Sequence, residues 1–129
     1  ILDAVASDGR RPLQRLADLG LVNPRLLCVH ATQLIDEEIA LLSDLGASVV
    51  HCPGSNLKLA SGFCEIAKLL DAGVNVALGT DGAASNNDLD MLGEIKMAAT
   101  VAKAVARNAS AVPAHPAPTI ALSPQHIRR

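Results

Sequence analysis

Leu78-Gly79-Thr80-Asp81-Gly82-Ala83-Ala84-Ser85-Asn86-Asn87 is the most informative segment of this chain. An apolar run from Val74 to Leu78 leads into a single carboxylate, Asp81, and the glycines on either side of it allow the backbone to turn sharply. This pattern predicts that Asp81 lies at the carboxyl end of a strand. In a barrel of alternating strands and helices, catalytic groups collect at that edge, because the loops after the strands share one mouth. Taken alone, however, an Asp-Gly pair is more typical of an ordinary turn.

A repeated pattern precedes this segment. Three times, a helix-forming stretch ends at a glycine and is followed by a short apolar run that ends at a polar residue. The helical stretches are 11–19, 36–45 and 63–70, the glycines are Gly20, Gly46 and Gly73, and the runs 26–29, 48–50 and 74–78 lead to His30, His51 and Asp81. Short apolar strands without alternation are typical of a parallel sheet covered by helices. The sequence therefore predicts an α/β fold of right-handed helix-strand units.

The pattern weakens toward the end of the chain. Residues 88–105 predict a longer closing helix, which Asp88 can cap and whose apolar side includes Leu89, Leu92 and Ile95. Beyond Ala106, prolines at 113, 116, 118 and 124 interrupt any helix. We therefore expect residues 1–105 to form one structural unit and residues 106–129 to be a Pro-rich tail, either loop or disordered.

Composition argues against several classes of partner. The 129-residue chain has a formal net charge of -2 and no cluster of Lys and Arg, so neither nucleic acid nor a membrane surface is an expected partner. Cys28, Cys52 and Cys64 lack a Cys-x-x-Cys spacing, which favours reduced thiols in a cytoplasmic protein. Because the chain opens with Ile1, inside a predicted helix, we expect it to be a piece of a longer protein.

Three consecutive predicted strands lead to His30, His51 and Asp81, which are residue types that bind metals or transfer protons. A single histidine at a strand end is more often a hydrogen-bonded structural residue than a ligand, and His51 before Cys52-Pro53 could simply shape a loop. Three such residues on one edge of a parallel sheet are harder to attribute to chance. Their common register favours a catalytic edge.

Two motifs carry a resemblance to a known family. His51-Cys52-Pro53-Gly54-Ser55-Asn56-Leu57-Lys58-Leu59 and the segment from Leu78 to Asn87 closely resemble the amidohydrolase superfamily. Within it, the likeness is to the 5-methylthioadenosine/S-adenosylhomocysteine deaminases and their chlorohydrolase-like relatives, and it extends from Ile1 to about Lys103. The resemblance implies a TIM-type (β/α)8 barrel with a divalent metal at its mouth, of which this chain supplies the sixth, seventh and eighth strands with their helices.

The resemblance also implies catalytic roles for two residues. Asp81 is similar to the aspartate after the eighth strand of the family, which binds the metal and takes a proton from the attacking water. His30 is similar to the histidine after the sixth strand, which polarises the attacking hydroxide and stabilises the intermediate. One divalent metal is implied. Histidine and carboxylate ligands suit zinc, and iron fits the same set.

Further residues are implied on the substrate side. His51, Ser55 and Asn56 resemble the loop after the seventh strand, which shapes that side of the pocket. Ser85 lies in the loop after Asp81, near the place where a nucleoside is expected. The implied partner is a small-molecule nucleoside or amino-heterocycle, and the parent protein is expected to be a homo-oligomer.

The implied function is metal-dependent hydrolysis of C–N bonds other than peptide bonds, in particular hydrolytic deamination of adenosine derivatives of the S-adenosylhomocysteine or 5-methylthioadenosine type. Guanine, triazine or cytosine as the substrate stays open. The family also needs a His-x-His pair, a further histidine and a glutamate that this chain does not supply. We therefore expect the chain alone to be inactive, and a catalytically inactive gene fragment is one alternative. Another is an α/β module that binds a small ligand without metal.

Overall fold

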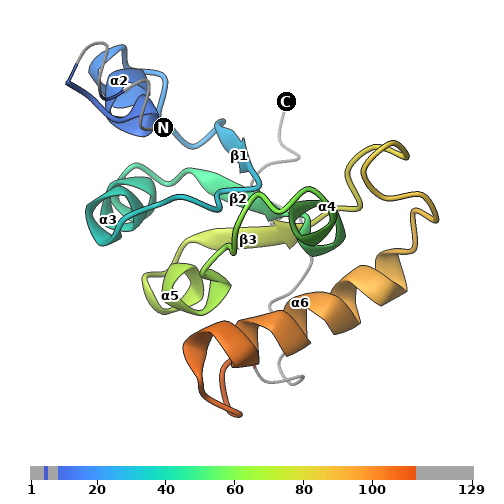
Figure 1. Ribbon diagram of the computed structural model, residues 1–129. Helices are drawn as coiled ribbons and strands as arrows, with labels where there is room; N and C mark the ends of the chain where they lie inside the picture. The colour runs from blue at the N-terminus through green and yellow to red at the C-terminus, as the bar shows by residue number, and fades with distance from the viewer. Residues whose placement is uncertain (1–4, 6–8, 113–129) are drawn as a thin grey trace.

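The computed structural model describes residue 5 and residues 9–112, arranged around a small parallel sheet (Figure 1). The strands are β1 (Leu27–Val29), β2 (Ser48–His51) and β3 (Asn75–Leu78), and they are hydrogen-bonded in the order β1-β2-β3. Both pairs are parallel, with Val29 opposite Val50 and His51 opposite Leu78. This sheet confirms the α/β class predicted from the short apolar runs. Most of the Pro-rich tail predicted for residues 106–129 lies outside the described residues.

Helices precede and follow each strand. Their bounds are α2 (Pro12–Asp18), α3 (Asp36–Asp44), α4 (Pro53–Lys58), α5 (Ile66–Asp71) and α6 (Met91–Ala106). α5 packs against β3 and α6, and α6 also contacts β3 and α4. In Figure 1, α4 lies at the end of the sheet to which the arrow of β3 points, beside the loop that leads into α6. The carboxyl ends of the strands and the first turn of α4 therefore share one edge of the molecule.

A glycine in a left-handed conformation ends each of the helices that precede a strand. The φ angles of Gly20, Gly46 and Gly73 are +69°, +68° and +79°. After α3, for example, the amide of Gly46 donates to the carbonyl of Ser43, and the amide of Ala47 donates to that of Leu42. The same pair of bonds follows α2 and α5, so these ends are Schellman motifs, in which glycine avoids the steric penalty of a Cβ. The helix-ending role predicted for the three glycines is confirmed.

The core lies on one face of the sheet. Val49 and Val76 are opposite each other in the register, and both are buried against Leu42 of α3 and Leu69 of α5 in a single apolar cluster. The other face is less covered: Val50 and Ala77 are only partly buried. On β1, which forms one edge of the sheet, 54% of Leu27 and 51% of Val29 are exposed. The helices therefore cover one face of this sheet, whereas parallel sheets usually have both faces buried.

Two of the secondary-structure predictions are wrong. Asp88 does not cap the closing helix: α6 begins at Met91, and its cap is Asp90, whose side chain accepts a hydrogen bond from the amide of Leu92. Asp88 Oδ1 instead lies 3.5 Å from the amide of Asp90, within the loop before the helix. The segment after His51, predicted as a loop, contains the short helix α4, which has Pro53 in its first turn where its missing N–H costs nothing.

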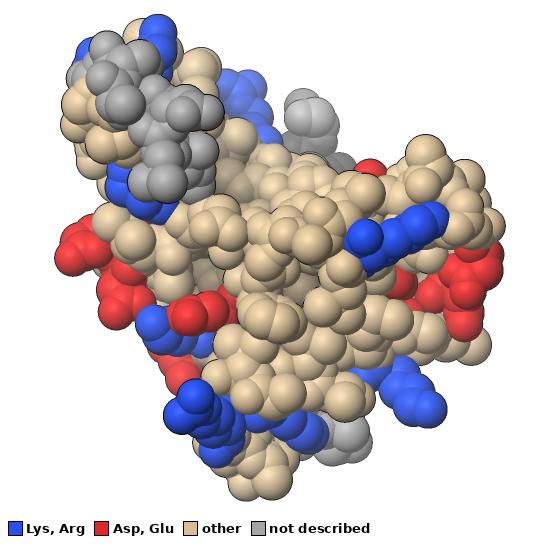
Figure 2. Space-filling model, in the orientation of Figure 1, with Lys and Arg blue, Asp and Glu red and all other residues tan. Residues whose placement is uncertain are grey.

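The surface carries charges of both signs. In Figure 2, acidic and basic side chains are distributed around the margin of the face, and much of its centre is uncharged. Several large apolar side chains are also exposed, including Leu92 on α6. Within the described part of the chain, no helix has both the length and the apolar character that crossing a membrane requires.

Candidate functional site

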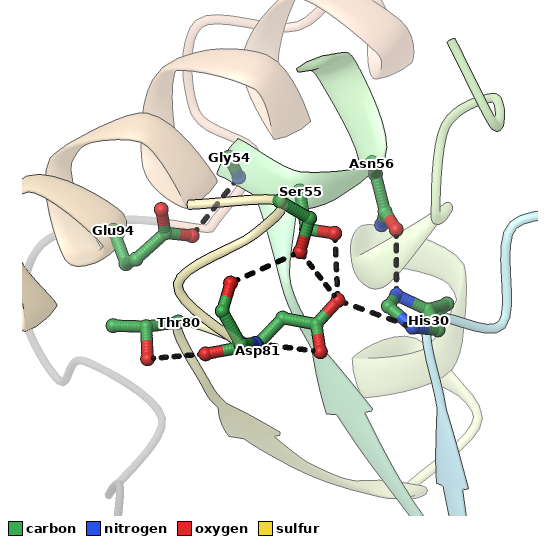
Figure 3. A network of polar contacts seen from close by, with 9 residues as sticks. His30, Gly54, Ser55, Asn56, Thr80, Asp81 and Glu94 are labelled. Atoms are coloured by element: carbon green, nitrogen blue, oxygen red, sulfur yellow. Dashed lines mark hydrogen bonds and ion pairs between the residues drawn. The ribbon is translucent and has the colours of Figure 1, made fainter. Parts of the chain in front are cut away.

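Polar side chains from three segments meet beyond the carboxyl ends of the strands (Figure 3). His30 follows β1, Ser55 and Asn56 lie on α4 after β2, and Asp81 follows β3. The sheet register brings these segments together, because the amide of His30 bonds to the carbonyl of Val50 and the amide of Gly79 bonds to that of His51. The sequence predicted that these residues converge at one edge of the sheet, and His30 and Asp81 do so.

The backbone at this edge adopts left-handed conformations. The φ angle is +71° at His30 and +62° at Asp81, a region that non-glycine residues rarely occupy, although Asp, Asn and His tolerate it best. We expected the glycines beside Asp81 to provide the sharp turn, but neither Gly79 nor Gly82 has a positive φ. Space around Gly79 is instead limited: a Cβ there would lie 3.2 Å from Val50 Cγ1 and 3.3 Å from Cys52 Sγ, so these side chains would have to shift slightly.

Asp81 is surrounded by hydrogen-bond donors. Its Oδ2 accepts from Ser55 Oγ at 2.7 Å and from Ser85 Oγ at 3.1 Å, and its Oδ1 accepts from the amide of Gly82 at 2.8 Å. These bonds hold the pKa of Asp81 below its usual value, with the Ser55 hydroxyl as the largest cause, followed by the Gly82 amide and the Ser85 hydroxyl. Asp81 is therefore a carboxylate anion at neutral pH, and about a third of its side chain is exposed.

His30 lies between Asp81 and α4. Its Nδ1 is 2.9 Å from Asn56 Oδ1, and its Nε2 is 3.6 Å from Asp81 Oδ2. With this orientation of the Asn56 amide, an oxygen faces Nδ1, so Nδ1 carries a proton and donates it. The Nε2 atom is then the ring nitrogen that faces the carboxylate. This arrangement leaves an imidazole nitrogen and an ionised carboxylate directed at the same small volume, which suits proton transfer or ligand binding.

The remaining predicted residues differ in exposure. Ser55 and Asn56 are buried and reach the site through Asp81 and His30, whereas Ser85 is partly exposed in the loop after Asp81, where its hydroxyl also lies 3.2 Å from the carbonyl of Gly82. The Nδ2 of Asn56 is buried without a hydrogen-bond partner. The structure thus brings five of the six predicted residues into one polar group, joined by hydrogen bonds and by the 3.6 Å contact between His30 and Asp81: His30, Ser55, Asn56, Asp81 and Ser85. Their roles in the reaction stay predictions.

His51 is the sixth predicted residue, and it is buried, with no hydrogen bond to this group among the described contacts. Only 2% of it is exposed, and its Nδ1 has no hydrogen-bond partner. Burial, with the neighbouring His30 as a secondary cause, lowers the pKa of His51 to about 4. His51 is therefore a neutral imidazole at neutral pH. A role for it in substrate binding stays a prediction.

Sequence reasoning missed Glu94, on α6. This carboxylate is buried, and it accepts hydrogen bonds from the amide of Gly54 at 3.0 Å and from Asn86 Nδ2 at 2.8 Å. Nothing in the spacing of residues 91–106 distinguishes Glu94 from a carboxylate on the solvent side of a helix. Its partners lie 40 and 8 residues away in the sequence, and only the fold brings them together.

A metal fits this site only in part. Asp81, the predicted ligand, is an ionised and accessible carboxylate, which is a ligand type that zinc accepts. Among the residues that the structure describes, however, no three His, Cys, Asp or Glu side chains gather closely enough to hold an ion. Asp81 can therefore serve as one ligand of a divalent metal, and the described residues do not form a complete ligand set.

Residues 1–122 match the sequence profile of the Amidohydrolase family. The chain belongs to the amidohydrolase family. Its relatives within the family include the 5-methylthioadenosine/S-adenosylhomocysteine deaminases of Teredinibacter turnerae and Saccharophagus degradans. The first is 59% identical over 91% of this chain and 26% of its own length, and the second is 53% identical over 87% and 25%. The chain thus spans about a quarter of the length of these curated relatives.

Solved amidohydrolase structures match the fold as well. An adenosine deaminase from Xanthomonas campestris with bound zinc overlays with a TM-score of 0.86 at 60% identity, covering 88% of this chain and 26% of that protein. An atrazine chlorohydrolase from Arthrobacter aurescens TC1, complexed with zinc and atraton, overlays with a TM-score of 0.75 at 31% identity, covering 81% and 23%. Both relatives were crystallised with zinc, and the amidohydrolase resemblance predicted from the two motifs is confirmed.

Proposed function

We propose that this chain forms part of the active site of a hydrolytic deaminase that acts on adenosine derivatives of the S-adenosylhomocysteine or 5-methylthioadenosine type. The observation that carries the proposal is the Asp81 carboxylate, held ionised by three donors and facing His30 Nε2 across 3.6 Å. The identity of 59% to the Teredinibacter turnerae deaminase supports this substrate class over others in the family. Homo-oligomerisation of the whole protein is proposed from the family resemblance alone.

The proposed architecture is the last part of a (β/α)8 barrel. β1, β2 and β3 would be its sixth, seventh and eighth strands, with residues 1–105 as the barrel portion. The parallel order of the strands and the overlay on the zinc-containing adenosine deaminase support this assignment. The incompletely covered sheet face, on which Val50 and Ala77 lie, would then point into the barrel interior.

The chemistry proposed for these residues is proton transfer around an attacking water. A bound divalent metal, zinc by the family resemblance, would lower the pKa of water and act as a Lewis acid. Asp81 would hold the metal, accept the proton of the attacking water and pass it to the leaving amine. His30, with Nδ1 donating to Asn56, would face the reacting group with Nε2 and would offset the negative charge that develops during the attack when Nε2 also holds a proton. Ammonia leaves, and the adenine ring becomes hypoxanthine.

The surrounding residues would orient these two groups. Ser55 and Ser85 fix the Asp81 carboxylate through its Oδ2 atom, and Asn56 fixes the ring of His30 through Nδ1. Ser85 is the most exposed of the three, so it is the one best able to reach a nucleoside hydroxyl or ring atom. His51 would belong to the segment that shapes the substrate side of the pocket.

A hybrid enzyme tests the proposal. In it, this chain replaces the homologous segment of the Teredinibacter turnerae deaminase, which supplies the remaining three quarters of the length. We expect the hybrid to bind zinc and to release ammonia from 5-methylthioadenosine and S-adenosylhomocysteine. Asp81→Asn should abolish turnover and weaken zinc retention, because the amide lacks both the ligand charge and the base, while Asn tolerates the φ of +62°. Asp44→Asn, on the exposed end of α3, is the matched control.

The outcomes separate the alternatives. Release of ammonia or chloride from guanine, cytosine or a triazine, without activity on the adenosine derivatives, would move the substrate to another amino-heterocycle. The overlay on the atrazine chlorohydrolase is the observation that favours this second candidate. A folded hybrid that neither binds zinc nor turns over any of these substrates would support a non-catalytic module. Near-normal activity of Asp81→Asn would remove Asp81 from the mechanism.

A further inference from the structure

Glu94 is a buried carboxylate outside the group of residues proposed for the reaction. Only 3% of it is exposed, although it lies in the first turn of α6, where acidic residues are usually solvated. Both of its oxygens accept a hydrogen bond: Oε2 from the amide of Gly54 at 3.0 Å, and Oε1 from Asn86 Nδ2 at 2.8 Å. Figure 3 shows Glu94 reaching across to Gly54 from α6. One side chain therefore contacts two of the three segments that carry the candidate site, α4 and the loop after β3.

The contact with Gly54 fixes the first turn of α4. A Cβ at Gly54 would lie 2.2 Å from Glu94 Oε1, so the close approach of the carboxylate depends on glycine at this position. The next two residues are Ser55, which donates to Asp81, and Asn56, which contacts His30. Any shift of this turn would therefore be transmitted directly to both catalytic candidates.

The contact with Asn86 fixes the loop that follows Asp81. The amides of Ser85 and Asn86 both donate to the carbonyl of Gly82, which closes a turn directly after Asp81. Asn86 ties this turn to the buried Glu94. On the outer side, Lys58 Nζ also holds the loop, donating to Asn87 Oδ1 at 2.5 Å, but Lys58 is exposed. Glu94 is therefore a buried connection between α4 and this loop, in addition to the Ser55–Asp81 hydrogen bond.

Placing a carboxylate in this buried position has a free-energy cost. Burying a charge is unfavourable unless its oxygens are hydrogen-bonded, and an apolar side chain of similar size would avoid that cost. What the carboxylate provides, and an apolar side chain could not, is two acceptors at fixed separation for two N–H donors on different segments. A buried carboxylate such as Glu94 therefore determines the relative geometry of the two segments and not only their stability.

We propose that Glu94 is a positioning residue for the reaction. It joins the first turn of α4 to the loop after Asp81, and it thereby sets the Ser55–Asp81 and Asn56–His30 contacts. Its effect on turnover rests on the proposed function, whereas its effect on the two segments does not.

Exchanging the donor and the acceptor tests this proposal in the hybrid enzyme. Asn86→Asp places a second carboxylate against Glu94 and should lower kcat by about 10- to 100-fold, the range expected for a small misplacement of reacting groups. In the double variant Glu94→Gln/Asn86→Asp, the amide nitrogen of glutamine donates to the new aspartate while its oxygen still accepts from Gly54. This variant keeps one carboxylate and one amide, and its kcat should return to within about threefold of the parent value.

Three measurements accompany kcat. Zinc content and KM should change little in all variants, because Glu94 contacts neither Asp81 nor His30. Hydrogen exchange of the backbone in residues 79–89 should become faster in Asn86→Asp and in Glu94→Ala, and it should return to the parent rate in the double variant. Glu65→Gln, which changes an exposed carboxylate immediately before α5, is the control and should leave kcat and exchange unchanged.

The two proposals fail in different ways. If the parent hybrid is inactive, the proposed function is wrong, and the exchange measurements alone decide whether Glu94 joins the two segments. Unchanged exchange of residues 79–89 in Glu94→Ala would overturn the positioning role. A double variant that is as slow as, or slower than, Asn86→Asp would overturn it too. Loss of zinc in parallel with kcat would also contradict it, because that result would make Glu94 part of the metal site or of general stability.

Discussion

Ser55 Oγ lies 2.7 Å from Asp81 Oδ2, so a hydroxyl on the helix after β2 holds the carboxylate that follows β3. This bond is the largest cause of the lowered pKa of Asp81. It also spans 26 residues of sequence, and it therefore depends on the parallel pairing of the two strands. The ionisation and the direction of the candidate catalytic base are thus consequences of the fold around it.

Ser55→Ala should slow the hybrid enzyme by about tenfold in kcat. A hydrogen bond to a charged group contributes roughly 1.5–3 kcal/mol, and we take the lower end because about a third of the Asp81 side chain is exposed. Steady-state kinetics with 5-methylthioadenosine measure the effect. Ser61→Ala, an exposed serine just beyond α4, serves as the control. A kcat equal to that of the parent would mean that Ser85 and Gly82 suffice to hold Asp81.

His30→Asn should lower kcat by about two to four orders of magnitude while leaving zinc content largely unchanged, which is the usual scale for a positioned acid-base group. Asparagine tolerates the φ of +71°, so the backbone of the site should persist. Kinetics and metal analysis of the same preparation provide the two readouts. If zinc disappears together with activity, His30 is a metal ligand and the role assigned to it here is incorrect.

His51 should make the protein less stable in acid. Its pKa is about 4 in the folded state and near 6.5 when unfolded, so between these values the unfolded state binds more protons. The free energy of unfolding should therefore fall as the pH drops from 6.5 toward 4, by about 3 kcal/mol for this residue. Urea titrations of the hybrid across this interval measure the slope. His51→Gln should flatten it, and an identical slope in that variant would exclude His51 as the cause.

The 129-residue chain alone should self-associate, bind zinc weakly and show no deaminase activity. β1 leaves apolar side chains exposed along a sheet edge, with 54% of Leu27 and 51% of Val29 accessible, and open edges of this kind pair with other chains. A sizing column, metal analysis and an ammonia-release assay provide the three readouts. A monodisperse monomer that melts cooperatively and holds one zinc per chain would contradict this expectation and favour a metal-binding unit that is stable by itself.

The sequence predicted those parts of the fold that have local causes. Gly20, Gly46 and Gly73 each end a helix because the left-handed position requires glycine, and the apolar run after each one forms a strand. The predicted convergence of His30 and Asp81 followed from this repeat, since parallel strands present their carboxyl ends at one edge. Helix bounds were less accurate: Asp90 caps α6 where Asp88 was predicted, because two aspartates in one short loop offer similar local signals.

The parts that the sequence did not predict depend on distant contacts. Asp81 has a left-handed φ, and its carboxylate is held by donors that include Ser55, 26 residues away. Glu94 was overlooked because the Gly54 amide that it binds lies 40 residues earlier. Helix α4 was predicted as a loop because Pro53 and Gly54 are usually loop residues, whereas here proline begins the helix and glycine makes room for Glu94.

The left-handed backbone conformations of His30 and Asp81 limit how the thermostability of the protein can be raised. Both residues occupy conformations that cost non-glycine residues on the order of 1 kcal/mol, and the surrounding fold has to compensate for that cost. Substitutions chosen only to raise the melting temperature would therefore favour glycine at these two positions, and each would remove a side chain that the reaction is proposed to need. At this edge of the sheet, thermostability and turnover are competing objectives, so stabilisation is better sought in the apolar cluster around Leu42 and Leu69.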